Sequence, residues 1–160
     1  HVDHFGGIKG LITDEDVANR VYIEAESVEK ANEKALEIGI YFDGVEEGYD
    51  CSCCGDRWSK PYDSFTNEFA LYEESGYRIS FTGQGTKEEV ADLFEIEFGG
   101  YGKIEDLKFE DVDNWGLSKL TARLYFYDIE SYIAYISYEY GHTTPDAILH
   151  YADGTKKVFY

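Results

Sequence analysis

The chain has 160 residues, of which 43% are hydrophobic and 17% aromatic, and its 33 acidic and 14 basic residues give a formal charge of −19. This apolar fraction is ample for a core and excludes a wholly disordered chain, and no apolar run approaches the roughly 20 residues of a membrane-spanning helix. A strongly negative surface repels nucleic acid and anionic membranes and attracts basic protein surfaces.

The first residues differ in composition from those that follow. Residues 1–16 mix glycine and charge with few apolar positions, which predicts a flexible N-terminal arm. Residues 17–160 have the length of one compact α+β domain. Two β-α segments within this stretch leave open a second organisation, in which two β-α subunits pack together.

A strand and a helix are the first regular elements predicted. Residues 20–25 alternate between two faces, as a β-strand does. Ser27 is a favourable N-cap for an amphipathic helix over residues 27–38, and a glycine follows the expected helix end. Residues 40–42 are apolar and are expected to resume as a strand, which would complete a β-α-β unit.

A second strand and helix follow. Residues 77–82 alternate as a strand, and Thr86 with Glu89 forms a capping box before a helix over residues 87–95. A glycine-rich turn then leads to a weaker strand candidate over residues 104–112.

The last third of the chain has the most regular β pattern. Residues 120–127 and 132–138 alternate and are rich in apolar and aromatic side chains, which predicts two strands. Asp153 and Gly154 stand between two short apolar runs and predict a hairpin turn. The whole pattern predicts an α+β fold with a mainly antiparallel sheet, two short helices and a C-terminal β-hairpin.

One cysteine-rich segment could carry chemistry. Cys51 and Cys54 have the spacing of a zinc knuckle, in which two thiolates converge on one metal ion. A closed structural zinc site needs four ligands, and no second Cys-x-x-Cys exists. The candidates to complete the site are Cys53, His142 and His150, or the same knuckle of a second copy in a homodimer.

A purely structural interpretation of the same segment stays open. The thiols would then line a tight turn that Gly55 permits. Arg57 and Trp58 would pack across this turn. A redox role is disfavoured, because neighbouring aspartates raise thiol pKa values.

Two stretches around this segment carry a resemblance to known proteins. The sequence IGIYFDG at residues 38–44, followed by DCSCCGDRW at residues 50–58, resembles a motif of small uncharacterised proteins of tailed bacteriophages. The likeness covers about residues 18–62. It implies a phage origin and a cytoplasmic location in a bacterial host cell, and it implies no activity.

Acidic clusters are the candidate partner-binding residues. They lack the spaced oxygen ligands and central glycine of an EF-hand, so a calcium site is disfavoured. The clusters contain Glu46, Glu47 and Asp50, and then Asp106, Glu110, Asp111 and Asp113.

The charge is the broadest guide to function. We expect a non-enzymatic protein that binds and inhibits or modulates a host protein with a basic, nucleic-acid-binding surface, such as a defence factor. Direct binding to nucleic acid or membranes is not expected. Two alternatives stay open: a zinc-stabilised adaptor that uses the Cys51–Cys54 knuckle, and a hydrolase with a carboxylate site. No nucleophile elbow is present, and no catalytic residue is assigned.

Overall fold

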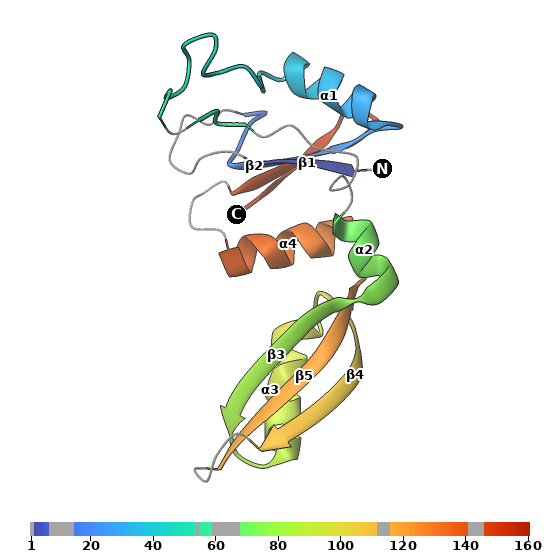
Figure 1. The fold of residues 1–160 in the computed structure, drawn as a ribbon. Helices are drawn as coiled ribbons and strands as arrows, with labels where there is room; N and C mark the ends of the chain where they lie inside the picture. Colours follow the sequence, from blue (N-terminus) through green and yellow to red (C-terminus); the bar gives the residue numbers. More distant parts are fainter. Residues whose placement is uncertain (1, 7–14, 54, 59–67, 112–115, 141–145) are drawn as a thin grey trace. The chain divides into compact units, whose positions relative to one another are not determined.

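The fold is described from a computed structural model. The described residues are 2–6, 15–53, 55–58, 68–111, 116–140 and 146–160. The chain divides into two compact units (Figure 1): unit 1 contains residues 1–67 and 136–160, and unit 2 contains residues 68–135. Both units combine helices with mainly antiparallel strands, which confirms the predicted α+β class. Unit 2 is inserted between the two parts of unit 1, an arrangement that the sequence did not predict.

Unit 1 contains a four-stranded sheet in the order β1-β2-β6-β7. Its strands are β1 (Val2–Gly6), β2 (Arg20–Glu24), β6 (Ala147–His150) and β7 (Lys156–Phe159). β2 pairs with β1 antiparallel and with β6 parallel. β6 and β7 form the predicted C-terminal hairpin, whose turn contains Gly154 at a φ of 91°.

Strand β1 corrects part of the predicted flexible arm. All five residues from Val2 to Gly6 pair with β2, so backbone pairing with a distant strand orders a segment that has little apolar character of its own. Residues 7–14 of the predicted arm lie outside the described residues.

Helix α1 (Val28–Glu37) packs on the core of unit 1. Its N-cap is Ser27, as predicted, whose hydroxyl accepts from the Lys30 amide at 3.2 Å. The buried Ala31 and Ala35 have short side chains, which let the helix backbone approach the core closely. The apolar pattern of the sequence therefore identified both the helix and its buried face.

The strand predicted for residues 40–42 does not form, so there is no β-α-β unit here. Ile40 is buried in the same core as Trp58, and Tyr41 and Phe42 pack against its edge. A short apolar run indicates burial, and here an irregular segment provides that burial instead of a strand.

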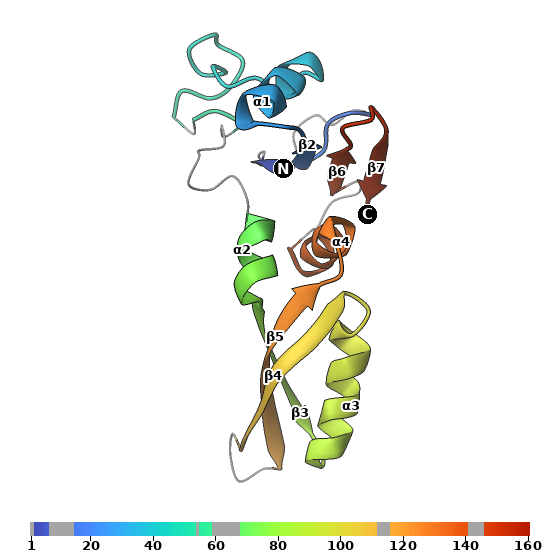
Figure 2. The same cartoon turned by 90° about the vertical axis from the view of Figure 1, so that its right-hand side faces the viewer.

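Unit 2 contains a three-stranded antiparallel sheet in the order β3-β5-β4. Its elements are α2 (Glu68–Ser75), β3 (Tyr77–Gln84), α3 (Lys87–Phe98), β4 (Gly102–Asp111), β5 (Leu117–Phe126) and the start of α4 (Ile129–Tyr140). β5 is antiparallel to both neighbours, so β3 and β4 run parallel with β5 inserted between them, a split β-α-β arrangement. Figure 2 shows α3 along one face of this sheet.

Aromatic side chains dominate the core of unit 2. Phe94 of α3 lies 4.9 Å, centroid to centroid, from Phe98, which in turn lies 6.2 Å from Tyr135 of α4. Tyr77 and Phe126 extend the same cluster from β3 and β5. Much of the tyrosine content therefore serves packing.

The strand predicted for residues 132–138 is wrong, because these residues belong to helix α4. Asp128 caps this helix: its Oδ1 accepts from the Ser131 amide at 2.7 Å. Tyr132, Ile133 and Tyr135 are buried at spacings that a helix provides. Tyrosine and isoleucine favour strands on average, and tertiary packing overrides that preference here. In the described part of the chain, no helix has the length and apolar character needed to cross a membrane.

Candidate functional site

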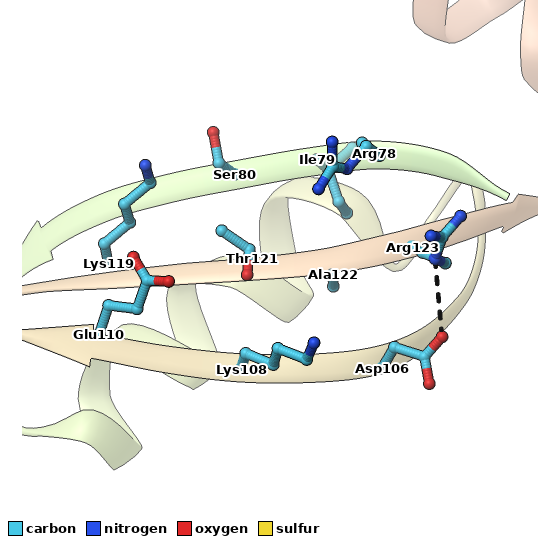
Figure 3. Close-up of a pocket in the computed structure, with 10 residues that line it drawn as sticks. All are labelled: Arg78, Ile79, Ser80, Asp106, Lys108, Glu110, Lys119, Thr121, Ala122 and Arg123. Atoms are coloured by element: carbon cyan, nitrogen blue, oxygen red, sulfur yellow. Dashed lines mark ion pairs between the residues drawn. The ribbon is translucent and has the colours of Figure 1, made fainter.

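The acidic residues predicted on β4 lie among basic side chains (Figure 3). Asp106 stands at a β-bulge with a φ of 55°, and its Oδ2 forms an ion pair with Arg123 Nε at 3.7 Å. Glu110 is the register partner of Lys119. This face therefore has mixed charge. The Asp111 side chain and Asp113 lie outside the described part of the structure.

A more uniform acidic surface lies on helix α3. Its solvent-exposed side chains include the acids Glu88, Glu89, Asp92 and Glu95. Among them stand two exposed apolar side chains, Leu93 at 47% and Ile96 at 79% exposure. Because residues three apart lie on the same side of a helix, Leu93 and Ile96 form one apolar patch bordered by carboxylates.

The opposite side of this helix packs on the core of unit 2 through three buried residues, Val90, Phe94 and Phe98. The sequence did contain a signal for the exposed side of α3, because Ile96 is apolar and falls outside the stripe of buried apolar residues. The single basic residue of α3, Lys87, is at its first turn, where its Nζ lies 5.9 Å from the centre of the Phe109 ring.

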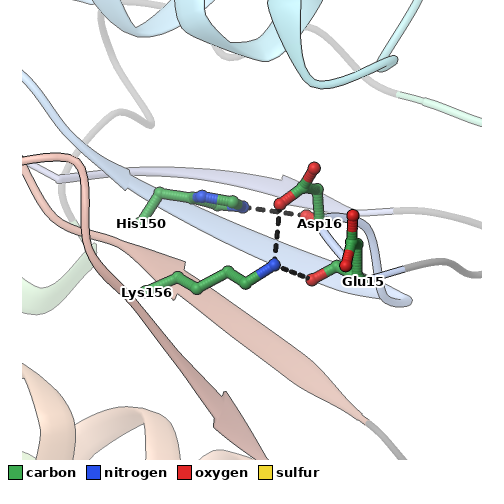
Figure 4. Close-up of polar contacts among 4 residues, drawn as sticks. All are labelled: Glu15, Asp16, His150 and Lys156. Carbon is green, nitrogen blue, oxygen red and sulfur yellow. Dashed lines mark hydrogen bonds and ion pairs between the residues drawn. The ribbon is translucent and has the colours of Figure 1, made fainter.

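His150, a predicted metal ligand, is a structural residue of unit 1 (Figure 4). It is 5% exposed, and its Nε2 lies 2.8 Å from the Asp16 carbonyl oxygen. A carbonyl can only accept, so Nε2 carries the proton and donates it. Lys156 holds the same segment by donating to the Glu15 carbonyl at 2.5 Å and to Asp16 Oδ1 at 2.8 Å. The Lys156 hydrogen bond lowers the pKa of the Asp16 carboxyl below its usual value.

The described cysteines lie on an exposed turn. Cys51 Sγ and Cys53 Sγ are 2.8 Å apart, and the Gly55 amide donates to the Cys51 carbonyl at 2.8 Å. Gly55 has a φ of 92°, as a tight turn requires. Two thiolates on one tetrahedral zinc ion stand about 3.8 Å apart, given Zn–S bonds of about 2.3 Å, so this pair would separate by about 1 Å to bind zinc.

The other predicted zinc ligands add no metal site to the described structure. Cys54 and His142 lie outside the described residues. Among the residues described, no group of three or more histidine, cysteine or acidic side chains is placed to hold a metal ion.

Asp50 organises the loop that carries the cysteines. Its Oδ1 accepts from the Tyr41 hydroxyl at 2.9 Å, and its Oδ2 accepts from the Arg57 amide at 2.6 Å. Burial and the Asp50 carboxylate raise the pKa of Tyr41 above its usual value. A side chain at Gly44 would collide with Asp50 and Tyr41. The motif of residues 38–58 is therefore bound together by these contacts, and Asp50 is occupied within the fold.

Arg57 and Trp58 close this loop on the core. Both are buried, and the guanidinium carbon of Arg57 lies 4.7 Å from the centre of the Trp58 ring. This geometry is a cation–π contact. The sequence predicted that this pair packs across the turn. Glu46 and Glu47, by contrast, are exposed on the loop.

Comparison with known proteins identifies a family and no individual relative. No curated protein and no solved structure matches the chain. Residues 6–108, more than half of the chain, match the family described as a domain of unknown function, DUF7296. The matched stretch includes the loop of residues 41–58, helix α3 and most of β4. The chain therefore belongs to the DUF7296 family.

Proposed function

We propose that this protein is a non-enzymatic binding protein whose α3 surface engages a basic surface of another protein. The observation that supports this proposal is the exposed patch of Leu93 and Ile96 bordered by Glu88, Asp92 and Glu95. Protein interfaces combine a desolvated apolar centre with a polar rim. The patch has this composition, and its rim has one sign of charge.

The charge of the whole chain suits the same role. A formal charge of −19 attracts a basic partner over a distance of about one Debye length, or about 8 Å at physiological salt, and thereby speeds the encounter. Carboxylates on α3 would then occupy positions that nucleic-acid phosphates otherwise fill. The partner class we propose is a nucleic-acid-binding protein of a bacterial host, such as a defence factor, and the chain would originate from a phage.

Affinity capture from bacterial lysate tests this proposal with two matched variants. The triple variant Glu88→Gln/Asp92→Asn/Glu95→Gln removes three negative charges from α3. The control Glu26→Gln/Glu29→Gln/Asp43→Asn removes three exposed charges elsewhere. Glu89 is left intact because it belongs to the helix cap.

We expect the wild type and the control to retain a basic partner at low salt and to release it when DNA is added. The α3 triple variant should lose the partner, and Ile96→Ala should weaken the retention even at high salt, where apolar contacts persist. Equal retention by both triple variants would show that α3 is not the binding surface.

A zinc-stabilised module is the second candidate, and the observation that favours it is the approach of two exposed thiols, Cys51 and Cys53. It predicts stoichiometric zinc in the purified protein and a lower melting temperature after chelation. Purified protein without zinc, together with a melting temperature that a chelator leaves unchanged, would eliminate this candidate.

A further inference from the structure

The basic residues of unit 2 gather on one face of its sheet. Residues 68–135 contain 15 acidic and six basic residues. The strand register places five of the six basic side chains on the face opposite α3. These five are Arg78, Lys103, Lys108, Lys119 and Arg123. The same register places Glu105 and Glu110 on this face, and Asp106 forms an ion pair with Arg123 there, so the five basic side chains stand beside three acidic ones. The face therefore has two more basic than acidic side chains, within a unit whose acidic residues outnumber its basic residues by nine.

Two arginines on this face are direct neighbours. Arg78 of β3 and Arg123 of β5 are register partners, and like charges directly across two strands destabilise a sheet. Arg123 is fixed in place, because its Nη1 donates to the Ser75 carbonyl at 2.5 Å and its Nε pairs with Asp106. Arg78 forms no ion pair with any acid in the described parts of the chain. The guanidinium of Arg123, which these contacts fix, therefore stands beside that of Arg78, whose charge no described acid neutralises.

Hydroxyl groups and two lysines continue the surface along the strands. Ser80 of β3 and Thr121 of β5 are the next register partners on this face. Lys108 of β4 is the register partner of Thr121 on the other side of β5. These residues and Lys119 line a shallow hollow of about 760 Å³ (Figure 3). This volume is within the range of about 300–1,000 Å³ that small-ligand sites occupy. Neither lysine makes an ion pair with an acid that the structure describes.

We propose that this face binds a small phosphate-bearing molecule, with one phosphoryl group between Arg78 and Arg123. A phosphoryl dianion balances the charge of Arg78 and offers three acceptor oxygens, which can also accept from the guanidinium of Arg123 beside it, whereas a carboxylate brings a single charge. Ser80 and Thr121 supply hydroxyl donors beside it. Lys108 and Lys119, farther along the strands, suit a second phosphate of the same ligand.

The charge of the chain favours a small ligand over a nucleic-acid polymer. A compact phosphate ligand inside the hollow stands among four basic side chains, which outnumber the two acids that also line it, Asp106 and Glu110. A polymer would extend beyond the hollow and over the acidic surface elsewhere on a chain whose formal charge is −19. The site is separate from the α3 surface, so its test does not depend on the proposed function.

Isothermal titration calorimetry of the full chain with sodium tripolyphosphate tests the site directly. We expect saturable binding of one ligand per chain at physiological salt, with the largest NMR amide shifts on β3 and β5. Arg78→Gln should weaken the affinity about tenfold, the effect of losing one charge-assisted contact. The matched control Lys30→Gln removes one exposed basic charge from α1 and should leave the affinity within about twofold.

Three outcomes would overturn the proposal: no saturation at millimolar tripolyphosphate, equal weakening by Arg78→Gln and Lys30→Gln, or tighter binding of a single-stranded oligonucleotide than of tripolyphosphate. A nucleoside triphosphate serves as a second probe. Equal affinity for tripolyphosphate and the nucleotide would show that the face recognises the phosphate chain alone. Higher affinity for the nucleotide would show that the face also contacts its base or sugar. Both results support a phosphate site.

Discussion

A buried ion pair joins two distant parts of the unit 1 sheet. Arg20 begins β2, and Asp146 directly precedes β6. The Nη1 atom of Arg20 lies 3.5 Å from Asp146 Oδ2 and donates to the Ile136 carbonyl at 3.2 Å. Asp146 is 1% exposed, and neither of its carboxylate oxygens accepts a hydrogen bond from a residue that the structure describes. The arginine charge is therefore the main compensation for burying this carboxylate.

We predict that Arg20→Met lowers the free energy of unfolding by about 3–5 kcal/mol at pH 7, because it leaves Asp146 buried and uncompensated. Urea unfolding in a Trp115→Phe background measures the loss, with the fluorescence of the buried Trp58 reporting on unit 1.

The double variant Arg20→Met/Asp146→Asn provides the control. Removing both charges should recover most of the loss, because no ion then remains buried. A deficit below about 1 kcal/mol for Arg20→Met, as an exposed pair would give, would refute the reasoning.

Three further predictions concern a cap, a loop and a surface pair. Thr86→Ala removes the hydroxyl that accepts from the Glu89 amide at 3.2 Å, and it should cost about 1 kcal/mol in urea unfolding, with Thr86→Ser retaining the stability. Gly44→Ala introduces a collision with Asp50 and should increase quenching of Trp58 fluorescence by acrylamide; unchanged quenching would contradict this account of the loop. Asp16→Asn should cost at most about 1 kcal/mol at pH 7, since its pair with Lys156 is partly exposed to solvent. Because the folded pKa of Asp16 is lowered, this contribution is complete above the usual pKa of 3.8 and disappears as the pH falls through the lowered value, which unfolding curves measured down to acidic pH would reveal.

Local signals in the sequence predicted the elements that local chemistry determines. Ser27 and Thr86 cap helices as expected, and Asp153 and Gly154 occupy the turn of the terminal hairpin. Each of these residues acts on backbone groups within a few positions, so neighbouring residues suffice to identify it. By contrast, β1 was missed, because it is defined by pairing with β2 and its own composition is that of a loop.

The surfaces were harder to predict than the elements. Arg78 and Arg123 are 45 positions apart in the sequence, and only the pairing of β3 with β5 makes them neighbours. Asp50 looked like a surface acid, and it accepts two hydrogen bonds inside its loop. A charge in a sequence does not reveal whether its partner is the solvent, the backbone or another side chain, because that depends on long-range contacts.

The insertion of unit 2 into unit 1 also constrains the order in which the chain can fold. The sheet of unit 1 needs β6 beside β2, and Arg20 pairs in register with Ala147. A ribosome must therefore synthesise all of residues 68–135 before that sheet can close, and closing so long a loop carries a large entropic cost. Unit 2 is continuous in sequence and has no such requirement. We expect unit 2 to gain its structure first, during synthesis, and β1 and β2 to wait for the last strands to emerge.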